Sequence, residues 1–285
     1  MKEPVFVIIP VHNRKLITLR CIESLKDNGD LGRYHIIIVD DGSTDGTDVA
    51  ISELYPDVIL LKGDGSLWWT GAISKGMNYA QQKGAEFFIW LNDDCITNSQ
   101  TLRLLVEYSR KKPNTIVGAA CYLSETNMLY PSGAKGRRRM MAKPSEVVHV
   151  DEMSGHCVCF PTQLIQQIGL PDIHRFPHYH GDSMYTLRAT RNGFSACILG
   201  DAQIYHSGEL KSRIQDFLDR SEQNLSLHSA FKKLFLCKKS FYFLPTQFFY
   251  YTNKYGLIIG TPVFVVKLFL WLLQFLRIQF LTTKQ

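Results

Sequence analysis

The sequence predicts an α/β protein whose mostly parallel sheet is flanked by helices, with a helical appendage in its C-terminal part. Apolar, β-branched runs alternate with helical patterns up to about residue 206, and three of these runs end in polar loops. Beyond about residue 209 the composition becomes aromatic and apolar. With 285 residues, 45% of them hydrophobic, the chain can bury one large core and a smaller appendage. We therefore expect one domain over residues 1–210 and a helical, aromatic-rich region over residues 211–285.

The first two predicted strands each end in a loop that suits ligand binding. The first strand covers residues 5–9 and ends in the polar loop of residues 10–14. The second covers residues 34–39 and ends at Asp40-Asp41-Gly42, where Asp and Gly supply turn geometry and backbone amides. Ligands of open α/β sheets bind in the crevice beyond the carboxyl ends of the strands. Both loops are therefore expected at the binding edge.

The third predicted strand, residues 87–91, is apolar throughout and ends at Asn92, Asp93 and Asp94. Oxygen ligands at a strand end suit a hard cation and the phosphates that it holds. The alternative is a helix cap, because Asn and Asp favour N-caps and residues 98–110 follow a helical pattern. The acidic end of the second strand favours the binding site over the cap.

Three further strands are predicted over residues 116–122, 153–160 and 198–204, and Gly155 interrupts the second of them. The basic run of residues 136–139 is either a solvated loop or a contact for an anionic ligand. We favour the loop.

Seven cysteines without a CxxC pair indicate a reduced, cytosolic chain. Cys157 and Cys159 alternate within an apolar segment, which favours strand packing over a redox or metal pair. The net charge is +6, and basic residues cluster within residues 135–143 and 232–239. No recognisable nucleic-acid-binding module accompanies these clusters, so we expect no nucleic-acid partner. No secretory signal precedes the first strand, and we therefore expect the catalytic part in the cytosol.

The loop motifs together resemble the nucleotide-sugar half of the family 2 glycosyltransferases, which have the GT-A fold, a Rossmann-like sheet. The resemblance rests on residues 10–14, 39–45 and 92–94, and it extends over about residues 4–206. Residues 63–71, Gly-Asp-Gly-Ser-Leu-Trp-Trp-Thr-Gly, are similar to a segment of bacterial rhamnosyltransferase-like enzymes of surface-polysaccharide assembly.

The resemblance implies a Mn²⁺ or Mg²⁺ site at the third strand end. Asp94 is then the direct metal ligand, and Asn92 and Asp93 reach the ribose, the sugar or a metal-bound water. His206 would approach the diphosphate or the metal from a late loop, and the alternative is a loop histidine without a special role. Imidazole suits manganese, whereas magnesium prefers oxygen.

The resemblance also places the nucleotide at the first two strand ends. Val11 and its neighbours would line the base, and Asp40 would accept a hydrogen bond from N3–H of uracil or thymine. Cytosine lacks that hydrogen, so we expect a UDP- or dTDP-sugar donor. Asp41 contacts the ribose or only caps the turn. The expected nucleotide and donor contacts are Pro10, Val11, His12, Arg14, Asp40, Asp41, Gly42, Trp69, Gly71, Lys75, Asn92 and Asp93.

Trp68 and Trp69 could offer an indole face to a sugar. On an extended segment, adjacent side chains point to opposite faces, so we expect one of them at most, Trp69, at the ligand. Family members commonly carry Arg-Asn or Asn-Asn shortly before the glycine that Gly76 matches, and this chain has Ile-Ser-Lys there. Lys75 is the candidate replacement for the missing diphosphate contact.

Asp182 stands where a further helical pattern begins. In the resembling family, an acidic residue before a helix with a downstream arginine, here Arg188, is the general base. The alternative is an N-cap worth about 1 kcal/mol, and one carboxylate can serve both purposes. Direct attack on the anomeric carbon needs a base for the acceptor hydroxyl's proton, whereas a divalent cation can neutralise the leaving diphosphate.

The apolar residues 257–276 approach the ~20 residues that a transmembrane helix needs. Pro262, Lys267 and the basic, aromatic flanks favour a helix that lies in the membrane interface. The alternative is an interface in a homo-oligomer or a cover for the catalytic domain. We expect a cytoplasmic protein that is peripheral on the inner face of the cell membrane.

These observations predict an inverting, metal-dependent glycosyltransferase. It would move a hexosyl or deoxyhexosyl unit, with rhamnosyl as one candidate, to a lipid-linked saccharide during synthesis of bacterial O-antigen or capsule. A non-catalytic, membrane-tethered scaffold that binds nucleotide sugars is an alternative, and it would need Asp94 at most, not Asp182. A nucleotidyltransferase would also gather carboxylates and a metal, but the chain lacks an obvious glycine-rich triphosphate loop near its start.

Overall fold

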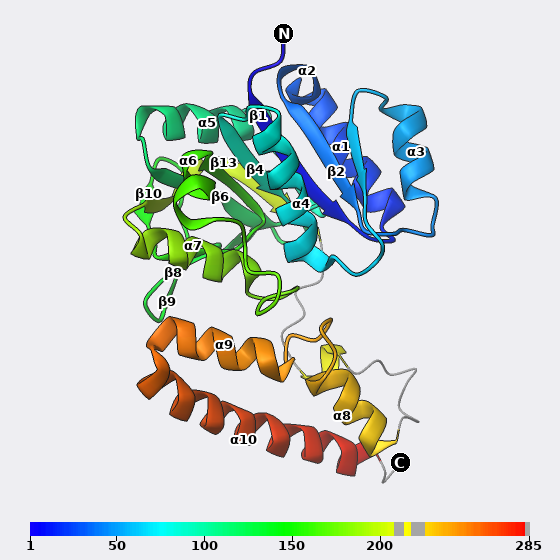
Figure 1. The fold of residues 1–285 in the computed structure, drawn as a ribbon, viewed down its shortest axis with the longest axis vertical. Coiled ribbons are helices and arrows are strands. Elements are labelled where there is room, and N and C mark those ends of the chain that lie inside the picture. The colour runs from blue at the N-terminus through cyan, green and yellow to red at the C-terminus, as the bar shows by residue number, and fades with distance from the viewer. Residues whose placement is uncertain (208–213, 218–225, 283–285) are drawn as a thin grey trace. The chain divides into compact units, whose positions relative to one another are not determined.

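A computed structural model describes residues 1–207, 214–217 and 226–282 (Figure 1). The chain forms two compact units. The first contains the described residues of 1–172 and 181–208, and the second contains those of 173–180 and 209–285. The chain therefore enters the second unit twice, once for a short excursion and again for its C-terminal part. The boundary expected between residues 210 and 211 lies outside the described residues.

A ten-stranded sheet forms the first unit, with the order β10-β13-β6-β12-β4-β1-β2-β3, while β5 pairs with β13 and β7 with β6. The strands are β1 Val5–Val11, β2 His35–Asp40, β3 Ile59–Lys62, β4 Phe87–Leu91, β5 Cys95–Thr97, β6 Thr115–Leu123, β7 Leu129–Tyr130, β10 Val147–His149, β12 Cys157–Pro161 and β13 Ser195–His206. β1 is parallel to β2 and β4, and β12 runs antiparallel between β4 and β6. The loops after β1, β2 and β4 therefore leave the same edge of the sheet.

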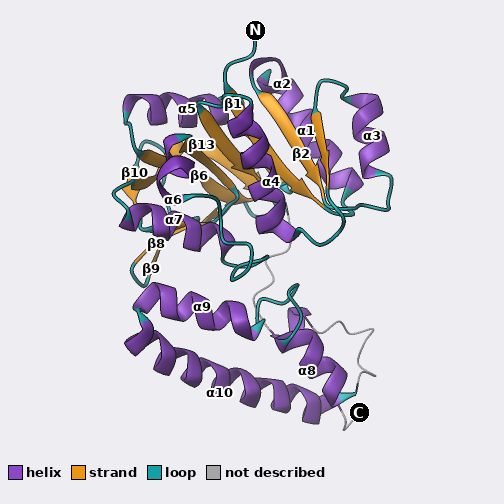
Figure 2. Ribbon diagram, in the orientation of Figure 1, coloured by secondary structure: helices purple, strands orange, loops and turns teal. Residues whose placement is uncertain are grey.

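Helices cover both faces of this sheet (Figure 2). They are α1 Lys15–Asp27, α2 Asp30–Arg33, α3 Thr47–Leu54, α4 Trp68–Gln82, α5 Thr101–Lys111, α6 Gln163–Ile168 and α7 Gly181–Arg191. In β1, Val7 and Ile9 join the core with α1, α3 and α5, whereas Ile8 joins the core with α4, α6 and α7. Successive strand side chains point to opposite faces, so a strand covered on both sides must be apolar throughout.

The predicted fold class is confirmed, and three local expectations need correction. Residues 153–160 form two elements, β11 Glu152–Met153 and β12, on either side of Gly155. Residues 136–139 are exposed to solvent as expected, but they do not form a loop, because β8 Gly133–Lys135 and β9 Arg138–Met140 make a hairpin that joins β11 in a three-stranded sheet. Gly136 makes its turn possible with a φ of 57°. The tryptophan pair is helical and not extended, because α4 begins there.

The second unit is helical, with η1 Ile214–Phe217, α8 Leu227–Phe235, α9 Leu244–Tyr255 and α10 Leu257–Thr282. Its core gathers Ile214, Ala230, Leu234, Phe235, Tyr242 and Phe275. Gly256 separates α9 from α10 with a φ of 78°, which a residue with a Cβ rarely adopts. Residues Leu257–Gln279 have a mean hydropathy of 2.0, so α10 is long and apolar enough to cross a membrane by length and composition alone.

Acidification is expected to destabilise the second unit through His178 and His180. Burial lowers the pKa of His178 to about 4 and that of His180 to about 3, with added repulsion from Lys239 and Lys254 respectively. Below pH 6.5, the ordinary pKa of imidazole, these histidines bind protons in the unfolded chain but stay neutral in the folded chain. The free energy of unfolding therefore decreases as the pH falls from 6.5 towards 4. We expect the Tm to fall by about 5 °C or more between pH 7 and pH 5, measured by calorimetry.

The variant His180→Phe provides the control for this expectation. The ring of His180 stacks on Tyr250 at 4.0 Å, a contact that phenylalanine can retain without titrating. The variant should therefore show a flatter dependence of Tm on pH, whatever its stability at pH 8. An unchanged slope would show that other groups govern the acid sensitivity.

Candidate active site

The loops expected at the binding edge meet in the structure. The backbone N–H of Asp41 donates to the carbonyl of Val11 over 2.9 Å. His12 Nδ1 lies 2.7 Å from the carbonyl oxygen of Asp41. These two contacts hold the loop after β1 against the loop after β2. Arg14, further along the first loop, reaches the loop after β4.

Arg14 bridges the two carboxylates that follow β4. Its Nη1 lies 2.8 Å from Asp93 Oδ1, and its Nη2 lies 2.9 Å from Asp94 Oδ2. Burial raises the pKa of Asp93 to about 7, although the Arg14 charge opposes the shift. Burial acts in the same direction on Asp94, but the charges of His206 and Arg14 outweigh it and hold the pKa of Asp94 below its ordinary value. Asp94 is therefore the more readily ionised of the two, as a metal ligand must be.

His206 ends β13 beside Asp94. Its Nε2 lies 3.5 Å from Asp94 Oδ1, and its side chain is 7% exposed. Its Nδ1 is buried and has no hydrogen-bond partner within residues 1–207, 214–217 and 226–282. The backbone N–H of Ser207 donates to the carbonyl of Asp94 over 2.9 Å. The end of the last strand and the acidic loop are therefore fixed to each other.

His156 is a neighbour of this site that was not among the predicted site residues. Its ring centroid lies 5.0 Å from that of His206, and its carbonyl accepts the N–H of Asn92 over 3.0 Å. Burial lowers the pKa of His156 to about 4, with a further contribution from the charge of His206. The imidazole is therefore neutral at pH 7. The available sequence signal was a histidine directly after Gly155, where backbone can approach a ligand closely.

Asp94 and His206 are suited to hold a divalent cation. A carboxylate oxygen and an imidazole nitrogen 3.5 Å apart can bind one ion, and this donor set suits manganese better than magnesium. The nitrogen of His206 that faces Asp94 is Nε2, so it is the candidate ligand. In the described part of the chain, no group of three or more His, Cys, Asp or Glu forms a complete metal site. A cation here would thus keep positions open for phosphate oxygens and water.

Trp69 connects the acidic loop to the helix that carries Asp182. Its Nε1 donates to Asn92 Oδ1 over 2.9 Å, and its ring meets Trp90 edge-on with centroids 5.3 Å apart. Gly155 leaves room for the indole, because a Cβ at this position would overlap the ring. The N–H of Gly155 donates to Asp182 Oδ2 over 2.7 Å. One tryptophan–glycine contact therefore links Asn92 to Asp182.

Asp182 lies in the first turn of α7. Its Oδ1 accepts the backbone N–H of Ser183 over 2.7 Å, in addition to the bond from Gly155. Burial raises the pKa of Asp182 above its ordinary value of 3.8, and the backbone N–H groups of Gly155 and Ser183 oppose that shift. A carboxylate with a raised pKa is a stronger proton acceptor. Arg188 of the same helix donates through Nη2 to the carbonyl of Leu170 over 2.7 Å.

Asp40 and Asp41 are both buried but have different partners. Asp40 Oδ1 accepts the N–H of Ser43 over 3.0 Å, and the described residues donate no other hydrogen bond to this carboxylate. The Asp41 carboxylate accepts three backbone N–H groups from residues 65–68, at 2.9 to 3.2 Å. Asp41 therefore holds the loop before α4 in place, which is the turn-capping role considered for it. Asp40 keeps an oxygen available for a ligand.

The other predicted donor contacts lie around the same loops. Pro10 and Val11 end β1, Gly42 follows β2 with a φ of 69°, and Gly71 lies in the first turn of α4. Lys75 is exposed and donates its Nζ to the carbonyl of Lys62 at the end of β3. Their contacts with a donor remain predictions.

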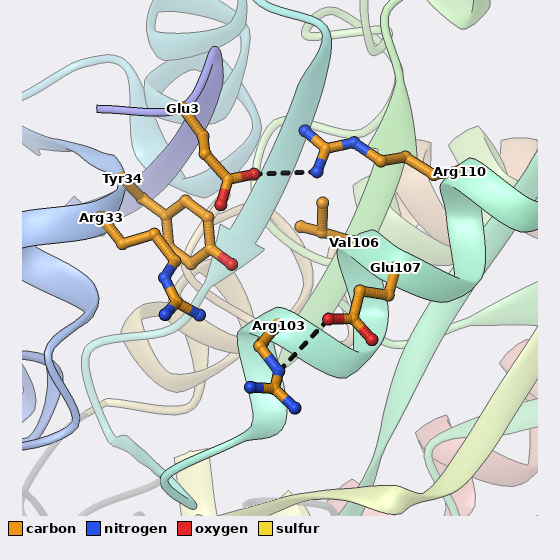
Figure 3. Close-up of a pocket in the computed structure, with 7 residues that line it drawn as sticks. All are labelled: Glu3, Arg33, Tyr34, Arg103, Val106, Glu107 and Arg110. Atoms are coloured by element: carbon orange, nitrogen blue, oxygen red, sulfur yellow. Dashed lines mark hydrogen bonds and ion pairs between the residues drawn. The ribbon is translucent and has the colours of Figure 1, made fainter. Parts of the chain in front are cut away.

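A separate cavity has a volume of about 300 Å³. Figure 3 shows the residues that line it. It is lined by Glu3, Arg33, Tyr34, Arg103, Val106, Glu107 and Arg110. Glu3 and Tyr34 precede β1 and β2, so this cavity lies at the amino ends of these strands, away from the acidic loop. Four of its charged side chains form two ion pairs, in which Arg110 lies 2.9 Å from Glu3 and Arg103 lies 3.3 Å from Glu107. We assign it no part in the candidate active site.

Gly155→Ala is expected to lower kcat/KM by about 10- to 100-fold and to lower the free energy of unfolding by about 1–3 kcal/mol. The added Cβ would push the Trp69 indole away, and with it the Asn92 amide that the indole holds. Steady-state kinetics check this expectation. The control is Gly84→Ala, because a Cβ there meets nothing within 4 Å, although its φ of 78° adds backbone strain. Equal kinetics of the Gly155 variant and the parent protein would contradict it.

Comparison with known proteins places this arrangement in a family. The profile described as "Glycosyl transferase family 2" matches residues 6–167. Glycosyltransferase AglE of Haloferax volcanii is 25% identical over 206 residues, which cover 69% of this chain and 64% of that protein. The chain therefore spans less than two thirds of the length of this curated relative.

Solved structures show the same fold. The crystal structure of GalNAc-T7 with UDP, GalNAc and Mn²⁺ matches with a TM-score of 0.61 at 15% identity, over 89% of this chain and 51% of that one. The crystal structure of S. aureus TarS matches with a TM-score of 0.55 at 17% identity, over 82% and 42% respectively. Both likenesses support a GT-A-like sheet and concern the fold alone. Because the family profile covers more than half of the sequence, this chain belongs to glycosyl transferase family 2.

Proposed function

We propose that this chain is an inverting, metal-dependent glycosyltransferase that uses a UDP- or dTDP-sugar. The transferred unit is a hexosyl or deoxyhexosyl group, with rhamnosyl as the first candidate because residues 63–71 are similar to rhamnosyltransferase-like enzymes. The acceptor is a lipid-linked saccharide of bacterial O-antigen or capsule synthesis. The enzyme acts in the cytoplasm, at the inner face of the cell membrane.

The observation that carries this proposal is the link from Asp182 to the acidic loop. Asp182 accepts a hydrogen bond from the N–H of Gly155, and the missing side chain of Gly155 makes room for the Trp69 indole. The indole N–H in turn donates to Asn92, which directly precedes the two carboxylates of the acidic loop. A base and a cation-binding carboxylate are thus held by one set of contacts. Direct displacement at an anomeric carbon needs both groups, on opposite sides of the sugar.

Asp182 acts as the general base in this proposal. Its raised pKa favours uptake of the acceptor hydroxyl's proton, while the bonds from Gly155 and Ser183 keep the carboxylate oriented. Asp94 and His206 would hold a divalent cation, Mn²⁺ or Mg²⁺, which would supply charge neutralisation for the leaving diphosphate. The GalNAc-T7 structure contains Mn²⁺, which supports the proposal of Mn²⁺ at this site. Arg14 holds Asp93 and Asp94 in place.

Asp40 is the residue proposed to recognise the nucleotide base. Its buried carboxylate accepts one hydrogen bond from the described residues, through Oδ1, which leaves Oδ2 to accept an N3–H group. UDP in the GalNAc-T7 structure supports a uridine donor, and thymidine presents the same N3–H. Asp41 then supports the neighbouring loop rather than the ribose.

A nucleotide-release assay tests the proposal. Purified protein, with Mn²⁺ or Mg²⁺, is given dTDP-rhamnose, UDP-glucose, UDP-galactose or UDP-N-acetylglucosamine, and calorimetry follows donor binding in the same samples. Release of a nucleoside diphosphate from one donor supports the transferase and names the sugar. Binding without release in the presence of acceptor would favour the scaffold, and release of pyrophosphate from a nucleoside triphosphate would favour a nucleotidyltransferase. Binding of no donor by the folded protein would overturn the donor site.

A further inference from the structure

α10 carries an apolar stripe on its exposed side, which ends at the exposed Arg277. Its members are Ile258, Ile259, Val265, Val266, Phe269, Leu270, Leu273 and Leu276, with exposures between 38% and 90%. From Ile258 onward they recur with the spacing of one face of a helix. Exposed apolar surface of this extent on a soluble protein marks a site of interaction.

The opposite side of α10 packs against its own unit along most of the helix. Gly260, in the first turn, lies so close to the backbone of Tyr251 in α9 that a Cβ would overlap it. Three ring pairs continue the contact, namely Phe264–Phe248, Trp271–Tyr242 and Phe275–Phe235, with centroids 5.5, 5.4 and 5.7 Å apart. A helix that crosses a bilayer alone has lipid on all sides. α10 has lipid-compatible surface on one side only.

The charges of the second unit determine which partner suits the stripe. The sequence of this unit, residues 173–180 and 209–285, contains twelve Lys and Arg and four Asp and Glu, so its net charge is positive. Lys232 and Lys238 are exposed, and by helical periodicity Lys267 lies at the flank of the stripe. An apolar stripe with a basic surround complements a bilayer with anionic headgroups, where long cationic side chains can reach the phosphates.

The same charges oppose a transmembrane position. α8 packs on α10 through Phe235 and carries Lys232 and Lys233. If α10 crossed the bilayer with this packing intact, these ammonium groups would be drawn towards the hydrocarbon, where they are strongly disfavoured.

We propose that α10 lies in the plane of an anionic membrane surface, with its apolar stripe at the boundary between headgroups and acyl chains. The C-terminal end of α10 then remains on the same side of the membrane as the rest of the protein. This inference rests on the membrane association proposed above and is independent of the donor sugar. It assigns the stripe to lipid and not to a second copy of the chain.

Vesicle flotation of the full-length chain tests the contact surface. The protein should float with vesicles of phosphatidylcholine and phosphatidylglycerol, and much less with phosphatidylcholine alone. Val265→Glu should lower the affinity by at least about tenfold. Val49→Glu is the matched control, because Val49 and Val265 are both helical valines with 55% exposure. Binding of the Val265 variant at the parent's level would overturn the stripe as the lipid contact.

A labelling experiment distinguishes a helix in the membrane plane from one that spans it. Gln285→Cys is combined with Cys237→Ala, which removes the one cysteine among the seven that is not buried. After binding to sealed vesicles, a membrane-impermeant maleimide added outside should label the new cysteine as fully as it does after detergent is added. Protection until detergent is added would show a spanning helix and overturn the proposal.

Two other results would be equally decisive. Failure of the parent protein to bind any vesicle would overturn the membrane association itself, and nucleotide release on a soluble acceptor would still test the transferase separately. A dimer in light scattering that Val265→Glu dissociates, without vesicle binding, would assign the stripe to a second copy.

Discussion

Asp182→Asn is expected to lower the rate of glycosyl transfer by about 10²- to 10⁴-fold while donor binding stays unchanged. The amide oxygen can still accept the N–H of Gly155, but the amide NH2 cannot accept that of Ser183, so one of the two local bonds is lost. The amide cannot take up the acceptor's proton. Transfer rates and calorimetric donor affinity are the two measurements. Because burial raises the pKa of Asp182 above 3.8, the acidic limb of kcat/KM in the parent protein should lie above that pH.

Asp151→Asn is the control for this variant. Asp151 accepts the N–H of Gly136 at the turn of the β8–β9 hairpin, away from the contacts that link Asp182 to the acidic loop. Its substitution should leave transfer within about twofold of the parent rate. If Asp182→Asn kept the parent's turnover, Asp182 would be a structural residue and the general base would have to be another group. If Asp182→Asn lost donor binding as well, its effect would be on the donor site.

Asp94→Ala is expected to abolish metal-dependent transfer, a loss of about 10³-fold or more that corresponds to about 4 kcal/mol. The variant removes the carboxylate whose pKa is held below its ordinary value and leaves His206 as the one remaining proposed ligand. Arg14 keeps its pair with Asp93 at 2.8 Å, so the loops should stay together. Calorimetry of Mn²⁺ in the presence of UDP should show metal affinity reduced by at least about tenfold.

Asp48→Ala is a suitable control here, since Asp48 is paired with Lys62 on the surface, 2.9 Å away. It should bind Mn²⁺ and transfer sugar as the parent does. Undiminished Mn²⁺ affinity in Asp94→Ala would show that the cation is bound elsewhere, and it would remove the metal assignment without affecting the assignment of Asp182.

The strands and the polar loops that follow them could be predicted because their signals are local. A strand buried on both faces must be apolar at every position, and β4 has the bounds that its apolar run predicts. Asn92, Asp93 and Asp94 directly follow it, so their place at the sheet edge follows from the strand. The basic hairpin was missed because its strands have only three residues each and the run of arginines reads as solvated.

The division of roles between neighbouring residues could not be predicted from the sequence. Asp40 and Asp41 are adjacent and chemically identical, yet Asp41 is held by three backbone amides from a loop more than 20 residues away. The contact of Trp69 with Gly155 joins residues that are still further apart along the chain. Such assignments depend on long-range packing, which leaves no periodic signal.

The sequence alone determined the α/β class, the family resemblance, the acidic loop and the apolar character of the C-terminal helix, since each follows from local pattern or motif. Only the tertiary structure decided that Arg14 bridges Asp93 and Asp94, and that His156 lies beside His206. It also decided which side of α10 is covered, because a helix that is apolar all round has no hydrophobic face until its neighbours pack against it.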